Sequence, residues 1–268
     1  MRIKYPKSEE KPPFQTFAEV ERQTKNATPK MAAQLWECVF LTLREIAELL
    51  DYVKEHASQR FVYPMFVLAA HTGARRAEIM RLKVRDVDFD SNLITIHERK
   101  KSHEKRTTRR VPISPQLRQV LEKWVAVHPG GEQLFCHDQT PTWRTYDRTD
   151  NDNSVTADEA HDQFKGTLAA TKWSRLRGWH LFRHSFCSNC AARGIDQRII
   201  DNWAGHLSEE MVRRRGDFRQ ASIPGGTPTL TVNSVLCQTP ESSRGMGSIS
   251  RSADVISDGS QSSNQDGQ

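Results

Sequence analysis

The sequence predicts a mainly helical fold with a small antiparallel β-sheet. Apolar residues recur with helical spacing over 42–56, where one stripe consists of Ile46, Leu49, Leu50 and Val53. An almost wholly apolar run, Phe61–His71, predicts a buried helix. Two short runs, Leu93–Ile96 and Arg109–Ile113, predict paired strands. We therefore expect a sheet near residues 84–113 among the helices.

End signals define the other predicted elements. Thr42 and Glu45 form a capping box for the first helix, and Ser114-Pro115 begins another. Further helices are expected over Arg75–Leu82, Trp179–Arg193 and Glu209–Arg215, and one more is capped by Asp196 and turns Ile199, Ile200 and Trp203 inward. The polar segment Asp138–Glu159 predicts a long surface loop. In the sheet region, we expect core positions at Val87, Phe89, Leu93 and Ile96.

Charge and composition divide the chain into three parts. The chain has 39 Lys and Arg and 33 Asp and Glu, a net charge of +6. From Gly216 onward, three arginines and five acids give −2, which leaves +8 on residues 1–215. We expect a polar N-terminal segment or linker over 1–41, a folded domain over 42–215 and a disordered Ser/Gly-rich tail over 216–268. A basic folded part predicts a polyanionic partner.

The expected compartment is a reducing cytoplasm. The five cysteines are an odd, scattered set, which does not indicate a disulfide framework. The N-terminus lacks the apolar core of a secretory signal, and no stretch approaches the roughly 18 apolar residues of a membrane span. We expect no membrane partner.

Four motifs rich in arginine, lysine and histidine follow one another along the chain. They are Thr-Gly-Ala-Arg-Arg-Ala-Glu over 72–78, a lysine-bearing hairpin ending in Arg-Arg-Val-Pro-Ile over 109–113, His-Leu-Phe-Arg-His over 180–184, and Trp-Ala-Gly-His over 203–206. Over residues 42–215, this order resembles the catalytic domain of the tyrosine recombinases, the phage integrase family. Each motif alone is weak, and the resemblance rests on all four in sequence.

The resemblance implies a fold, an activity and a partner. The fold is that of the DNA breaking-rejoining enzymes. The activity is DNA integration or site-specific recombination by transesterification on duplex DNA, without a metal, a cofactor or an external energy source. A mobile element is the expected origin, and the nucleoid is the expected place of action.

The resemblance also assigns roles around one scissile phosphate. Arg75 and Arg183 would clamp it, because a planar guanidinium donates two parallel hydrogen bonds to phosphate oxygens. His180, three residues before Arg183 on the same helical face, would accept a proton or bind the phosphate. His206 would add a hydrogen bond, although it could simply cap a helix. A hairpin lysine, Lys100 or else Lys101, would protonate the leaving oxygen.

Other cations of the same segments are expected to contact DNA. They are Arg76, Lys101, Lys105 and Arg106. Arg75 could be a solvated arginine at a helix start, and Arg76 could be confused with it. Glu78 is expected to be a structural partner of an arginine.

The sequence departs from the family at the nucleophile. The family's tyrosine lies about nine residues after the second histidine, where it attacks the phosphate. Here Arg215 occupies that position, and the tyrosines are Tyr5, Tyr52, Tyr63 and Tyr146. A guanidinium stays protonated and cannot be that nucleophile. We therefore expect a truncated or frameshifted recombinase that is cleavage-defective and also lacks the family's N-terminal DNA-clamping domain.

Three alternatives remain at this stage. The chain could be a non-catalytic DNA-binding remnant. It could instead supply its basic pocket to an intact partner subunit. A zinc-binding helical protein is the third alternative, because His180, His184, Cys187 and Cys190 recur along one helix. In the simpler interpretation, the two cysteines are small core residues.

Overall fold

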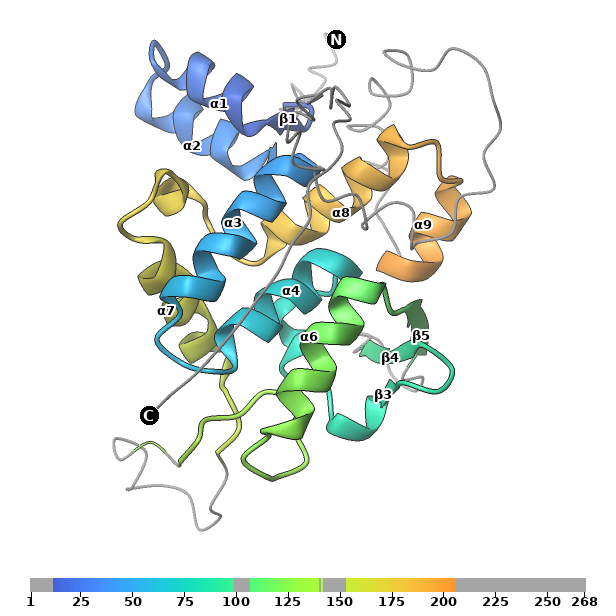
Figure 1. The fold of residues 1–268 in the computed structure, drawn as a ribbon. Helices are drawn as coiled ribbons and strands as arrows, with labels where there is room; N and C mark the ends of the chain where they lie inside the picture. The colour runs from blue at the N-terminus through green and yellow to red at the C-terminus, as the bar shows by residue number, and fades with distance from the viewer. Residues whose placement is uncertain (1–11, 99–106, 140, 142–152, 206–268) are drawn as a thin grey trace, which may run out of the picture.

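The computed structural model describes residues 12–98, 107–139, 141 and 153–205 (Figure 1). The helices are α1 (Phe17–Thr24), α2 (Pro29–Glu37), α3 (Leu43–His56), α4 (Val62–Thr72), α5 (Arg76–Ile79), α6 (Pro115–Ala126), α7 (Ala157–Leu168), α8 (His180–Ala192) and α9 (Gln197–Ala204), with short 3-10 helices η1 (Val84–Asp86) and η3 (Lys172–Arg175). The strands are β1 (Gln15–Thr16), β2 (Val39–Phe40), β3 (Val87–Asp88), β4 (Leu93–Glu98) and β5 (Thr107–Pro112). The mainly helical fold with a small antiparallel sheet is confirmed. In the described part of the chain, no helix is long and apolar enough to cross a membrane.

The N-terminal segment differs from the polar linker that the sequence predicted. β1 pairs in parallel with β2, and helices α1 and α2 connect the two strands in the sequence. Apolar side chains of both helices join the main core, namely Phe17, Val20, Leu35 and Trp36. Sparse apolar residues in two short helices give a weak periodic signal, so the sequence indicated one short helical piece, Phe14–Val20, but neither α2 nor a contribution to the core. The boundary at residue 42 therefore does not separate a linker from the core, because residues 17–41 contribute to it.

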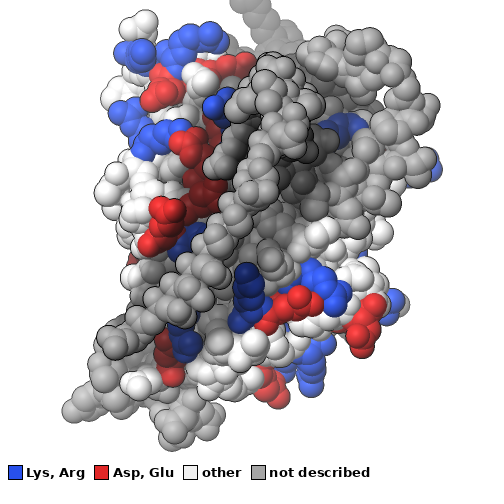
Figure 2. Space-filling model, in the orientation of Figure 1, with Lys and Arg blue, Asp and Glu red and all other residues white. Residues whose placement is uncertain are grey.

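Helix α3 is confirmed with its predicted capping box. The hydroxyl of Thr42 accepts a hydrogen bond from the backbone N–H of Glu45, and the Glu45 carboxylate accepts one from the backbone N–H of Thr42. Its apolar stripe is buried, whereas its outer face carries the exposed acids Glu48, Asp51 and Glu55. Figure 2 shows acidic side chains gathered along the part of the surface where α3 lies. The exposed side of α3 therefore carries more acidic than basic side chains, since Arg44 and Lys54 are its exposed cations.

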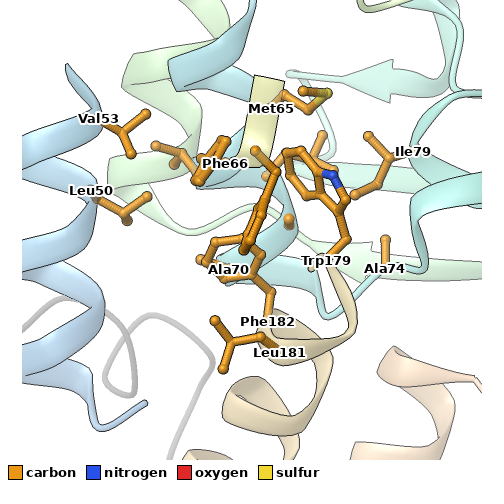
Figure 3. Packing of buried hydrophobic residues seen from close by; sticks show 14 of the residues in the cluster. Leu50, Val53, Met65, Phe66, Ala70, Ala74, Ile79, Trp179, Leu181 and Phe182 are labelled. Atoms are coloured by element: carbon orange, nitrogen blue, oxygen red, sulfur yellow. The ribbon is translucent and has the colours of Figure 1, made fainter. Parts of the chain in front are cut away.

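Helix α4 is the buried centre of the domain, as its apolar sequence predicted. It packs against α3, α6 and α8, and Figure 3 shows Phe66 and Ala70 of α4 between side chains of α3 and α8. The Phe66 ring lies 4.8 Å from that of Trp179 and 5.5 Å from that of Phe182, measured between centroids. Gly73 ends the helix in the left-handed conformation, with φ 60°. This rigid helix fixes the start of the segment that carries Arg75.

The sheet has the antiparallel order β3-β4-β5. Ile94 and Ile96 face the core from β4, and Val111 faces it from β5. Val87 is buried too, and the partly buried Phe89 packs against the core, but Leu93 is only half-buried, which corrects that predicted core position. The reason is alternation, since Leu93 lies on the opposite face from Ile94.

Helix α7 lies partly where the sequence predicted a long loop. The loop was expected to run to Glu159, yet α7 begins at Ala157, behind a capping box formed by Thr156 and Glu159. Ala160, Phe164 and Leu168 bury one face of this amphipathic helix against the core. The polar first turn concealed the helix start, because its charged residues serve as cap rather than loop. Residues 142–152 of the predicted loop lie outside the described residues.

Helices α8 and α9 carry the C-terminal motifs. Both were predicted, and the Asp196 carboxylate caps α9 by accepting a hydrogen bond from the backbone N–H of Arg198 at 2.8 Å. Ile200 is fully buried, but Ile199 is 44% exposed, which corrects the inward orientation predicted for it. Adjacent helical residues point about 100° apart, and in α9 Ile200 lies on the core side while Ile199 lies toward solvent. The helix predicted over 209–215 lies outside the described residues.

Candidate functional site

The structure describes part of the predicted site. Arg75, Arg76, His180 and Arg183 are among the described residues. Those outside them are Lys100, Lys101, Lys105, Arg106, His206 and Arg215. The roles predicted for that second group stay predictions.

Arg75 stands at the N-terminus of α5, directly after the turn that ends α4. Its backbone is extended, and its guanidinium donates a hydrogen bond to Glu78 Oε1 at 2.8 Å. The backbone N–H of Arg75 donates to the other oxygen of the same carboxylate at 2.9 Å. The side chain remains 36% exposed, so Arg75 is both held in place and open to solvent.

Arg183 lies beneath Arg75, almost fully buried on α8 at 1% exposure. Its guanidinium donates hydrogen bonds to three backbone carbonyls, those of Gly73 at 3.2 Å, Ala204, and Gly205 at 3.1 Å. Burial, together with the nearby charge of Arg75, lowers the pKa of Arg183 to about 10, so the group remains cationic at neutral pH. This arginine therefore connects the end of α4 with the end of α9.

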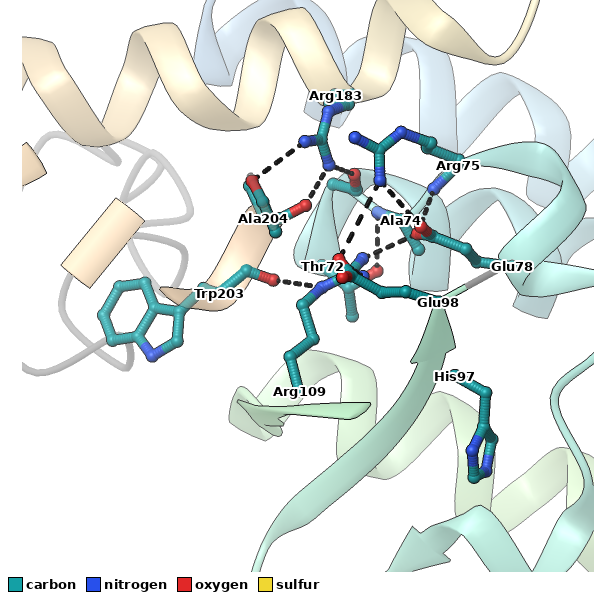
Figure 4. A network of polar contacts seen from close by, with 12 residues as sticks. Thr72, Ala74, Arg75, Glu78, His97, Glu98, Arg109, Arg183, Trp203 and Ala204 are labelled. Carbon is teal, nitrogen blue, oxygen red and sulfur yellow. Dashed lines mark hydrogen bonds and ion pairs between the residues drawn. The ribbon is translucent and has the colours of Figure 1, made fainter. Parts of the chain in front are cut away.

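His180 completes the cluster one turn before Arg183. Its ring is accessible to solvent at the start of α8. The pKa of His180 is lowered, first by its partial burial and then by the positive charges of Arg183 and Arg75. Because Arg75 acts electrostatically on both α8 residues, the three predicted groups share one neighbourhood, and Figure 4 shows the guanidinium groups of Arg75 and Arg183 side by side. Burial and the two nearby cations therefore favour the neutral imidazole and oppose its protonation.

Glu78 is the acidic centre of this arrangement. It is 3% exposed, and its two carboxylate oxygens receive hydrogen bonds from Arg75 and Arg109. Burial alone would raise the pKa of Glu78, but the hydrogen bonds and charges of the two arginines outweigh it and lower the pKa to about 2. Glu78 is therefore the arginine partner that the sequence predicted, and it is ionised at any physiological pH.

Arg109 and Glu98 belong to the same network, and the sequence did not identify them. Arg109 is 6% exposed and donates to Glu78 Oε2 at 2.7 Å, to Glu98 Oε1 at 2.9 Å and to the carbonyl of Trp203 at 2.8 Å. One signal was available, since strand alternation places Arg109 on the same face as Val111 and Ile113. An arginine at a core-facing strand position requires buried partners.

Two glycines with positive φ shape the backbone around Arg183. Gly73 has φ 60°, and a Cβ there would meet Phe186 Cδ1 at 2.9 Å. Gly205 has φ 78° and ψ 168°, a conformation that is almost restricted to glycine. A Cβ at Gly205 would also overlap the carboxylate of Glu98. Both positions therefore require glycine, and both present a carbonyl to Arg183.

The zinc alternative does not fit this geometry. In the described part of the chain, no three histidine, cysteine or acidic side chains meet as a group that could hold a metal ion. Cys187 and Cys190 are buried in an apolar cluster with Phe186 and Ile200. His184 packs against Phe14 with a centroid separation of 4.5 Å. The two cysteines are therefore core residues.

Comparison with known proteins agrees with this geometry. A sequence model of the phage integrase family matches residues 39–215. The chain belongs to the phage integrase family. The match covers all four motifs of the sequence analysis, so the predicted resemblance to tyrosine recombinases is confirmed.

Individual relatives of this phage integrase family member are distant. The chain is 25% identical to tyrosine recombinase XerA of Pyrococcus furiosus over 63% of its own length and 53% of that protein's, so it spans about half of that relative. It is 28% identical to the type 1 fimbriae regulatory protein FimB of Escherichia coli K12, over 62% of this chain and 78% of FimB.

A solved structure shows the same fold. The Tn1549 transposon integrase in complex with transposon right end DNA superposes with a TM-score of 0.52 at 18% identity. The superposition covers 74% of this chain and 64% of that one.

Proposed function

We propose that this chain is a DNA-integration and site-specific recombination protein of the tyrosine recombinase type that holds duplex DNA by its phosphates. In this proposal, Arg75 and Arg183 supply two guanidinium groups to one scissile phosphate, and His180 adds a hydrogen bond or accepts a proton. Lys100 and His206 complete the site, while Arg76, Lys101, Lys105 and Arg106 contact neighbouring phosphates. Other recombinase subunits are the further partners that it implies, and the cytoplasmic nucleoid is the place of action.

The observation that carries the proposal is the cationic cluster. Three guanidinium groups, from Arg75, Arg109 and Arg183, share the network with two carboxylates, from Glu78 and Glu98, which leaves one net positive charge. Arg75 and His180 are accessible to solvent, whereas Arg183 is buried. A phosphate placed there would gain charge-assisted hydrogen bonds in a partly desolvated setting.

The proposal includes the loss of strand cleavage. Arg215 occupies the position of the family's nucleophilic tyrosine, and the sequence contains no tyrosine after Tyr146. Phosphoryl transfer still needs a nucleophile, however well the phosphate is held. We therefore propose that the chain alone binds DNA without forming a covalent link to it.

The binding half of the proposal is tested by titration of a fluorescent 30-base-pair duplex at several salt concentrations. Arg75→Gln should weaken binding about tenfold. It should also reduce the slope of log affinity against log salt by about one unit, which corresponds to the loss of one phosphate contact. Arg44→Gln, which changes an exposed arginine of the acidic α3 helix, is the matched control and should leave both values unchanged. Equal effects of the two substitutions would contradict the assignment of the phosphate to Arg75.

The chemical half is tested with a nicked suicide substrate, which traps any covalent protein–DNA product. We expect the chain to give no adduct on a denaturing gel. Arg215→Tyr is the gain-of-function variant, and an adduct that appears only with it would support the proposed reason for inactivity. An adduct formed by the unaltered chain would refute the proposed cleavage defect.

A further inference from the structure

Arg109 is buried at a position where strand geometry calls for an apolar side chain. In the β4–β5 register it lies opposite Ile96, which is fully buried. Its neighbours on the same face, Ile94 and Val111, are also fully buried. A whole buried ion pair can often be replaced by well-packed apolar residues, whereas removal of one partner alone leaves a buried charge and is costly. The charge of Arg109 therefore calls for an explanation other than core packing.

The contacts of Arg109 connect three elements that meet at the site. Its guanidinium reaches Glu78 on α5 at 2.7 Å, Glu98 on β4 at 2.9 Å and the Trp203 carbonyl on α9 at 2.8 Å, as Figure 4 shows. These three contacts use the rigid fork of one side chain. The relative positions of α5, β4 and α9 are therefore set by a single planar group.

The contact with Glu78 determines how that carboxylate is shared. Glu78 Oε1 accepts from Arg75 at 2.8 Å, while Oε2 accepts from Arg109 at 2.7 Å and from the Arg75 backbone at 2.9 Å. If Arg109 lost its charge, the buried carboxylate would have only Arg75 as a partner and would neutralise it more fully. Arg75 would then be less available to a phosphate.

The contact with Trp203 fixes the other side of the site. The carbonyl of Trp203 accepts from Arg109, and the next two carbonyls, those of Ala204 and Gly205, accept from Arg183. Two buried arginines from different elements thus hold three consecutive carbonyls at the end of α9. That end leads directly to His206 in the sequence.

We propose that Arg109 is a positioning residue that sets Arg75, through Glu78, and the end of α9, through the Trp203 carbonyl. This inference rests on the proposed function, because its consequence is the binding of a phosphate at Arg75. Arg109 itself does not touch the phosphate. It acts by keeping the α5 and α9 sides of the site in one arrangement.

The test is a double-substitution cycle with the 30-base-pair duplex as probe. Arg109→Met should weaken DNA binding about fivefold to tenfold in the unaltered chain and less than twofold when Arg75→Gln is present, because a positioning residue acts through the group it positions. Arg109→Lys should give an intermediate loss, since an ammonium lacks the planar fork. Arg110→Met removes an exposed arginine from the opposite face of the same strand, and the cycle with Arg110→Met should be additive.

A second readout does not depend on DNA. In protein labelled with 5-fluorotryptophan, the Trp203 resonance, assigned with Trp203→Phe, should shift in both Arg109 variants and stay in place in Arg110→Met. Arg109→Lys keeps the charge, so it provides this measurement even if Arg109→Met does not fold.

The outcomes separate the inference from the proposed function. If Arg75→Gln weakens binding and the Arg109 variants do not, or weaken it equally with and without Arg75, the inference alone is overturned. An unshifted Trp203 resonance in both Arg109 variants also overturns it. If Arg75→Gln leaves binding unchanged, the proposed function fails, and the inference that rests on it fails too.

Discussion

The two arginines proposed to clamp one phosphate are held in opposite ways. Arg75 is 36% exposed and is bound by the carboxylate of Glu78, whereas Arg183 is 1% exposed and is bound by backbone carbonyls. A carboxylate cancels charge and can give way to another anion. Carbonyls orient a guanidinium but leave its charge in place. We therefore expect a phosphate to displace the carboxylate at Arg75, while the charge of Arg183 stays fixed by its carbonyl partners.

The largest expected effect is a loss of stability when the buried arginine, Arg183, is replaced. Arg183→Met leaves the carbonyls of Gly73, Ala204 and Gly205 without their buried donor. We expect the free energy of unfolding to fall by about 4 kcal/mol, because buried polar groups without partners are costly. Urea unfolding monitored by circular dichroism measures this. Arg198→Met changes an exposed arginine of α9 and should cost less than about 1 kcal/mol; a similar cost for both would contradict the structural role of Arg183.

The second prediction concerns acid stability on the Arg75 side. The pKa of Glu78 in the folded chain is about 2, below its ordinary value of 4.5. A depressed carboxylate pKa stabilises the fold above pH 4.5, and this contribution is lost as the pH falls towards 2. We expect the loss to be on the order of 3 kcal/mol and to be absent in Glu78→Gln.

The quantity to compare is the difference in the free energy of unfolding between the parent chain and Glu78→Gln, because a second group titrates in a neighbouring pH range. Burial disfavours the charged ring and lowers the pKa of His71 to about 4, so the fold loses stability as the pH falls from 6.5 to about 4. That loss is common to the parent and Glu78→Gln. If their free energies of unfolding run parallel from pH 4.5 to 2, the carboxylate is not held as described.

The smallest predicted effect sharpens the comparison at His180, between the two arginines. Burial, Arg183 and Arg75 lower the pKa of His180, while Glu78 opposes them slightly. A bound phosphate adds negative charge and favours the protonated ring. DNA affinity should therefore rise a few-fold as the pH falls below 6.5, the ordinary pKa of histidine. This increase in affinity should be absent in His180→Gln. Titrations with the fluorescent duplex at pH 7.5, 6.5 and 5.5 measure it, and an identical pH dependence in both proteins would argue against a phosphate at His180.

The sequence predicted the parts of the fold whose signals are local. The long amphipathic stripe of α3 and the apolar run of α4 were recognisable because each element carries its own periodicity. Helices α2 and α7 were not recognised, since each buries few side chains and begins behind a polar capping residue. For Ile199, the error was one of orientation, which depends on where neighbouring elements lie.

The same distinction applies to the site. Arg75, His180 and Arg183 could be selected because their motifs follow one another in a recognisable order. Arg109 could not, because its partners are 31, 11 and 94 residues away and come together only in the folded chain. Even so, Arg109 lies on the same face of its strand as core-facing Val111, and this was a visible sign of a buried charge.

The most direct test of the account follows the side chains themselves during DNA binding. In nitrogen-15 spectra of the guanidinium and imidazole groups, assigned with Arg75→Gln, Arg183→Lys and His180→Gln, a short DNA duplex is added stepwise. We predict that the signals of Arg75, Arg183 and His180 shift together along one binding curve, as expected for groups around a single phosphate. Binding of the duplex that leaves these three signals in place would contradict the account.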